Sequence, residues 1–140
     1  MKFSTHTTMT KILDALFTTY SERVPDVKKI TQAMVENGMV KNQNEIINDH
    51  VAFRTMGVEN LGIASFEKIF LAHGYEKRDF FHFEVKKLDA HWYAPPTPDL
   101  PRIFISELKV DLLSEKVQKI IRKYTDSVSS DPVDHLDLNN

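Results

Sequence analysis

The spacing of apolar residues changes near Asp49, and this change constrains the fold more than any other feature of the 140-residue sequence. Before this point, apolar residues recur every three or four positions, which is typical of helices that bury one side. After it, "DHVAFRT" alternates between two faces, which predicts a strand. A helix over about 62–72 and three more strands up to residue 109 follow. The order strand, helix, strand, strand, strand predicts an α+β fold.

The N-terminal part of the chain, residues 1–45, is predicted to be helical. A first amphipathic helix is indicated by the 3.6-residue spacing of apolar side chains between residues 9 and 20. Pro25 suits the first turn of a second helix, and Gly38 suits its C-terminal end. We interpret the pair as a helical hairpin that forms a brace for the rest of the chain.

Residues 46–110 are predicted to form the strand-rich module. Its last three strands are expected in "YEKRDFFHFEV", "DAHWYAP" and "RIFISELKV". In the last strand, Ile103, Ile105 and Glu107 share one face, and Phe104 and Ser106 share the other. The link "PPTPDLP" cannot join a strand ladder, so it is predicted to be a rigid loop.

Two segments follow the module. Residues 111–126 contain "SEKVQKIIRKY", which predicts an amphipathic helix capped by Ser114. Its packed side would consist of Val117, Ile120, Ile121 and Tyr124. Residues 127–140, "SVSSDPVDHLDLNN", are rich in small and acidic side chains, with little to bury. They are predicted to be a flexible tail or a truncated linker.

Charge and cysteine content limit the kinds of ligand and partner that the protein can bind. Eighteen basic and twenty acidic residues give a net charge of −2, so no basic surface for nucleic acid is expected. The sequence has no cysteine, so a metal would be held by histidine and carboxylate side chains. No apolar run is as long as a membrane span, and the N-terminus lacks the apolar core of a signal peptide. A cytoplasmic location without membrane contact is predicted.

His50 and Arg54 form the first candidate site. Both fall on the same face of the first predicted strand, and four residues of extended chain separate their Cα atoms by roughly 13 Å. Two such groups can bind opposite ends of one small molecule, because arginine forks onto carboxylates and neutral histidine is a common metal ligand. The spacing alone favours an exposed edge strand that carries two solvated side chains.

Glu107 is the second candidate, at the end of the last predicted strand. Its carboxylate could be a metal ligand, or it could pair with a neighbouring Lys or Arg at the edge of the sheet. The residues alone favour the ion pair. The sequence has no glycine-rich phosphate loop and no HExxH motif.

Three stretches, "NDHVAFRTM", "FEVKKLDAHWYAPP" and "LPRIFISELKV", resemble the 2-oxoadipate dioxygenase/decarboxylase family in sequence and in order. The similarity extends over most of residues 10–125. This family lies in the glyoxalase-like, or vicinal-oxygen-chelate, superfamily. The resemblance therefore implies one βαβββ module between the helical brace and the C-terminal helix.

The resemblance also implies a non-haem Fe(II) enzyme that converts 2-oxoadipate and O₂ to 2-hydroxyglutarate and CO₂, in lysine catabolism. On this basis, His50 would be an iron ligand and Arg54 would bind a carboxylate of the 2-oxo dicarboxylate. The second iron histidine and the glutamate of the family come from a second module, downstream of the part matched here.

The metal site of this chain is therefore expected to be incomplete. The chain would be a fragment, a degenerate relative that binds without catalysis, or a single-module protein. The single-module alternative is a homodimeric glyoxalase-like protein that binds a metal or another ligand. Two copies of His50 and Glu107 would then surround a twofold axis.

Overall fold

The computed structural model describes residues 7–138, and these divide into two compact units. The first unit contains the chain up to Asp49 together with Asp99–Pro101. The second contains His50–Pro98 and the chain from Arg102 onward. The second unit contains the strands of the sheet, and both candidate sites lie within it.

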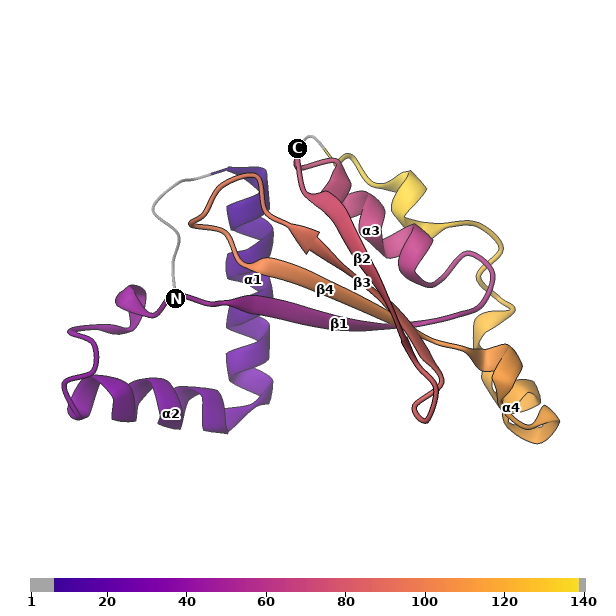
Figure 1. Cartoon of the computed structure of the whole chain (residues 1–140), viewed down its shortest axis with the longest axis horizontal. Helices are drawn as coiled ribbons and strands as arrows, with labels where there is room; N and C mark the ends of the chain where they lie inside the picture. The colour runs from indigo at the N-terminus through magenta and orange to yellow at the C-terminus, as the bar shows by residue number, and fades with distance from the viewer. Residues whose placement is uncertain (1–6, 139–140) are drawn as a thin grey trace. The chain divides into compact units, whose positions relative to one another are not determined.

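The described part of the first unit, from residue 7 onward, is mainly helical. It contains α1 (Thr8–Arg23), α2 (Pro25–Glu36) and a short 3₁₀ turn, η1 (Gln43–Glu45) (Figure 1). Pro25 is the first residue of α2, and Gly38 follows the helix with a φ of 70°. No helix within residues 7–138 is long and apolar enough to cross a membrane.

The second unit is built on one four-stranded sheet that confirms the predicted βαβββ order. The elements are β1 (His50–Met56), α3 (Ile63–Leu71), β2 (Glu76–Phe83), β3 (Leu88–Ala94) and β4 (Arg102–Leu108) (Figure 1). The strand order is β1-β4-β3-β2. β1 runs parallel to β4, and the other neighbours are antiparallel. Because β1 and β4 are far apart in sequence, this pairing brings the two predicted site strands side by side.

Aromatic side chains fix α3 to one face of the sheet. The ring of Phe53 on β1 lies 4.9 Å from that of Phe66 and 5.6 Å from that of Phe70, both on α3. Phe70 in turn contacts Tyr75 at 5.7 Å. Such edge-to-face and tilted contacts add to the burial of apolar area. The fully buried side chains of the sheet include Ile103, Ile105 and Tyr93.

A polar contact reinforces this packing. The hydroxyl group of buried Tyr93 donates a hydrogen bond to Glu67 of α3, and Lys77 of β2 pairs with the same carboxylate at 2.8 Å. Burial, together with the hydrogen bond to Glu67, raises the pKa of Tyr93 well above its usual value. The tyrosine therefore remains a neutral donor that joins helix and sheet.

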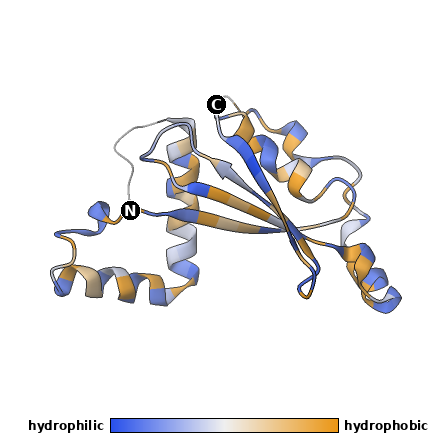
Figure 2. Ribbon diagram, viewed as in Figure 1, coloured by the Kyte–Doolittle hydropathy of each residue, from blue (hydrophilic) through white to orange (hydrophobic). Residues whose placement is uncertain are grey.

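The predicted C-terminal helix is present as α4 (Glu115–Thr125), after a 3₁₀ turn, η2 (Val110–Leu112). Figure 2 shows both hydrophobic and hydrophilic residues along it, as an amphipathic helix requires. Its apolar stripe is not packed as predicted, because Val117, Ile120 and Tyr124 are exposed. Ser114 is the N-cap residue, but its side chain makes no capping hydrogen bond.

The segment after α4 differs from the expected flexible tail. Its residues form a 3₁₀ turn, η3 (Pro132–His135), and Val133 is buried. Asp131 accepts hydrogen bonds from Ser65 at 2.6 Å and from Lys68 at 2.7 Å, both on α3. Ion pairing and one buried valine dock this segment, although its composition is typical of disorder. Residues 139 and 140 lie outside the described part of the chain.

Candidate functional site

The strand register separates the predicted site residues onto two faces of the sheet. Arg54 on β1 lies opposite Ser106 on β4, which lies opposite Ala90 on β3. Side chains in register, and those two positions away, share a face. We call the face opposite α3 the Arg54 face. Its members include His50, Ala52, Arg54, Phe81, Ala90, Trp92, Phe104 and Ser106.

Arg54 is exposed on this face, as the alternation of β1 predicts. Its Nε donates a hydrogen bond to Ser106 Oγ at 3.4 Å. The two terminal nitrogens have no hydrogen-bond or ion-pair partner within residues 7–138. An unpaired guanidinium edge of this kind can bind a carboxylate through two parallel hydrogen bonds.

His50 is the first residue of β1 and lies on the same face as Arg54. Its side chain is exposed. No group of three or more His, Cys, Asp or Glu side chains that could hold a metal ion is found in the described residues. Residues 7–138 thus fit a complete metal shell poorly, and His50 is a candidate ligand that lies on the same face of the sheet as Arg54.

The structure does not bring Glu107 together with His50. Glu107 lies opposite Thr55 on β1 and Asp89 on β3, one position out of phase with the Arg54 face. Its Oε2 accepts a hydrogen bond from the backbone N–H of Ile63, at the N-terminus of α3, at 3.1 Å. Its Oε1 lies 3.9 Å from Lys109 Nζ. The carboxylate therefore caps a helix and faces a lysine, which agrees with the ion-pair alternative.

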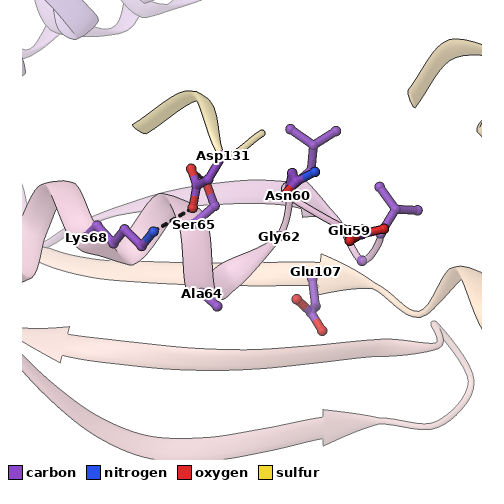
Figure 3. A pocket seen from close by; sticks show the side chains of 11 residues that line it. Glu59, Asn60, Gly62, Ala64, Ser65, Lys68, Glu107 and Asp131 are labelled. Atoms are coloured by element: carbon purple, nitrogen blue, oxygen red, sulfur yellow. Dashed lines mark hydrogen bonds and ion pairs between the residues drawn. The ribbon is translucent and has the colours of Figure 1, made fainter. Parts of the chain in front are cut away.

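A cavity of about 470 Å³ lies beside Glu107, at the start of α3 (Figure 3). It is lined by the loop after β1 and by Ser65, Lys68 and Asp131. Two of its charged groups, Lys68 and Asp131, pair with each other at 2.7 Å, and Lys68 also contacts Asp134 at 2.6 Å. The hydrogen bonds from Lys68 and Ser65 lower the pKa of Asp131 to about 2. We assign these groups a structural role, in docking η3 to α3.

Sequence reasoning missed Ser106 as a partner of Arg54. The alternation of the last strand predicts that Ser106 and Ile105 point to different faces. Nothing in the local pattern, however, connects Ser106 with Arg54, which lies 52 positions earlier. The contact depends on the parallel pairing of β1 with β4. The sequence therefore indicates Ser106 as a partner of Arg54 only once the pairing of β1 with β4 is known.

The sheet order and the placement of α3 define the class of the fold. A solved protein from Ralstonia eutropha JMP134, assigned to the glyoxalase superfamily, superposes with a TM-score of 0.65 at 21% identity. The match covers 84% of this chain and 36% of that chain. The fold is therefore glyoxalase-like, as predicted.

The chain belongs to the 2-oxoadipate dioxygenase/decarboxylase family, which it matches over residues 12–140. It is 37% identical to the chloroplastic 2-oxoadipate dioxygenase/decarboxylase of Arabidopsis thaliana, over 83% of this chain and 33% of the relative. The crystal structure of hydroxyglutarate synthase from Oryza sativa in complex with 2-oxoadipate has a TM-score of 0.75 and 39% identity. That match covers 83% of this chain and 39% of the rice chain.

The chain thus spans about a third of the length of the curated relatives that it matches.

Proposed function

We propose that this chain forms part of the substrate site of an Fe(II)-dependent 2-oxoadipate dioxygenase/decarboxylase. The reaction takes 2-oxoadipate and O₂ to 2-hydroxyglutarate and CO₂. The observation that carries the proposal is the unpaired guanidinium edge of Arg54, on the same face of the sheet as His50. Family membership and the 2-oxoadipate bound to the rice relative support it.

Arg54 performs the recognition step in this proposal. A 2-oxo dicarboxylate has one carboxylate beside the ketone and a second at its far end. The guanidinium binds the far carboxylate, and this anchors the molecule with its ketone end toward His50. A charged hydrogen bond of this type contributes on the order of 1.5–3 kcal/mol when it is partly shielded from water.

His50 is one iron ligand in this proposal, and the remaining ligands come from outside residues 7–138. When bound, Fe(II) supplies the O₂ chemistry that protein side chains lack. The structure favours the alternative, a homodimeric single-module protein, less, because Glu107 lies on the α3 face and caps a helix, away from His50. A cytoplasmic location stays a prediction, and two plant relatives carry names that place them in the chloroplast.

The test is Arg54→Ala, made in this chain and at the aligned arginine of a full-length relative, with O₂ uptake and CO₂ release measured on 2-oxoadipate. We expect kcat/KM to fall by about tenfold or more, which corresponds to roughly 1.4 kcal/mol per decade. Arg54→Lys should restore activity only in part, because lysine lacks the planar fork. A 2-oxo acid without the distal carboxylate should lose much less activity from the same change.

Arg78→Ala is the matched control, because Arg78 lies on the same sheet and is already paired with Glu76 at 2.6 Å. This variant should keep its activity. An equal loss for mono- and dicarboxylate substrates in Arg54→Ala would contradict the assignment of Arg54 to the distal carboxylate. No loss with either substrate would exclude Arg54 from the site.

A further inference from the structure

Ser106 lies in the middle of β4 and is one of the few buried polar residues, with 4% of its surface exposed. Its hydroxyl group makes two hydrogen bonds. Oγ accepts from Arg54 Nε at 3.4 Å and donates to the backbone carbonyl of Phe53 at 3.2 Å. A buried hydroxyl that is held on both sides has little freedom to rotate.

The hydrogen bond from Ser106 Oγ to Phe53 fixes the direction in which the hydroxyl group can accept the hydrogen bond from Arg54. Phe53 belongs to β1, whose backbone is fixed by its parallel pairing with β4. The proton of Ser106 Oγ therefore points at a rigid carbonyl, and its lone pairs are left for Arg54 Nε. This arrangement ties one edge of the guanidinium to the sheet.

Arginine can form a fork through Nε and one terminal nitrogen, or through both terminal nitrogens. With Nε bound to Ser106, the terminal pair remains available for a ligand. The neighbours in the same row of the sheet, Ala90 and Phe81, carry no side-chain hydrogen-bonding group. Within this row, Ser106 is thus the residue whose side chain can hold Arg54 in one orientation by a hydrogen bond.

We propose that Ser106 is a positioning residue for ligand recognition, which holds Arg54 so that its two terminal nitrogens together bind one carboxylate of the substrate. The inference rests on the proposed function of Arg54. It adds a residue that does not itself contact the ligand. It also specifies the geometry of the contact, which is an end-on fork onto a single carboxylate.

The first test is a double-mutant cycle read by calorimetric titration with 2-oxoadipate, combined with steady-state kinetics. Ser106→Ala should raise Kd and KM by about three- to tenfold, as expected for the loss of one hydrogen bond that orients a charged group. Its kcat should change little, because the contact is equal in ground and transition states. In an Arg54→Ala background, the same change should have no further effect.

Ser106→Thr keeps the hydroxyl group and should restore most of the affinity. Thr55→Val is the matched control, because Thr55 Oγ1 donates to the backbone carbonyl of Ser106 at 3.0 Å but lies on the α3 face. It removes a hydroxyl from the same strand pair without touching Arg54. Its affinity for 2-oxoadipate should equal that of the wild type.

The second test needs no ligand and uses the NMR signal of the Arg54 Nε–H group. Ser106→Ala should shift this signal and speed its exchange with water, whereas Thr55→Val should leave it unchanged. An unchanged Nε–H signal in Ser106→Ala would overturn the positioning role.

The two proposals fail in different ways. If Arg54→Ala leaves 2-oxoadipate binding unchanged, the proposed function is wrong, and the NMR signal still decides whether Ser106 orients the guanidinium. If Arg54→Ala weakens binding but Ser106→Ala acts equally in both backgrounds, the positioning inference is wrong and the proposed function stands.

Discussion

Arg54 and Glu107 lie one register position apart in the β1–β4 pair, but their side chains point to opposite faces of the sheet. A strand turns successive side chains to opposite faces, so a shift of one position changes a possible ligand group into a helix cap. Ser106, beside Glu107 in sequence, faces Arg54 instead. At this scale the alternation of β1 and β4 decides which groups can share a ligand.

Gly62 depends on the position of Glu107. It precedes α3 with a φ of 121°, which L-residues rarely adopt, and an added Cβ would lie 2.8 Å from Glu107 Oε2. Gly62→Ala should therefore lower the free energy of unfolding by about 2–3 kcal/mol, from backbone strain together with a displaced cap. Urea denaturation followed by circular dichroism measures this loss.

Gly38→Ala is the control for Gly62→Ala. Gly38 also has a positive φ, of 70°, but an added Cβ would meet nothing within 4 Å. It should cost only about 1 kcal/mol, from the left-handed backbone alone. Equal losses in the two variants would show that the contact with Glu107 contributes nothing.

At the scale of elements, the sequence predicts each helix and strand of the module. Apolar residues recur with the 3.6-residue period of a helix or the two-residue period of a strand, and both periods can be recognised within short stretches of sequence. It does not predict the contact between α3 and η3. Lys68 and Asp131 are 63 positions apart, and their ion pair follows no periodic pattern. For the same reason, the partner of Arg54 could not be predicted, whereas the shared face of His50 and Arg54 could.

The docking of η3 should depend on pH through Asp131. The pKa of Asp131 is lowered to about 2 in the folded protein, mainly by the hydrogen bond from Lys68, against about 3.9 in the unfolded chain. A carboxylate with a lowered pKa stabilises the fold fully above pH 4, and this contribution is lost as the pH falls toward 2. Asp131→Asn should cost about 1–2 kcal/mol at pH 7, after allowance for the half-exposed Lys68.

The measurement is the difference in unfolding free energy between wild type and Asp131→Asn, taken from pH 7 down to pH 2.5. The difference should remain constant to about pH 4 and then shrink. Asp134→Asn is the control, because Asp134 pairs with Lys68 but its side chain is 59% exposed. Its effect should be smaller at every pH. A pH-independent difference for Asp131→Asn would contradict the assigned pKa.

At the scale of the whole molecule, metal binding tests how much of the site this chain provides. Residues 7–138 offer His50 on the Arg54 face, and they bring no three candidate ligands together. Iron sites of the two-histidine, one-carboxylate type need all three side chains to bind firmly.

The 140-residue chain alone should therefore bind Fe(II) only weakly in an anaerobic titration, and His50→Ala should remove what binding remains. In a full-length relative, replacement of the histidine aligned with His50 should abolish stoichiometric iron. Tight binding of one Fe(II) by the monomeric 140-residue chain would mean that other side chains complete the shell. Retention of that iron in His50→Ala would then remove His50 from the site.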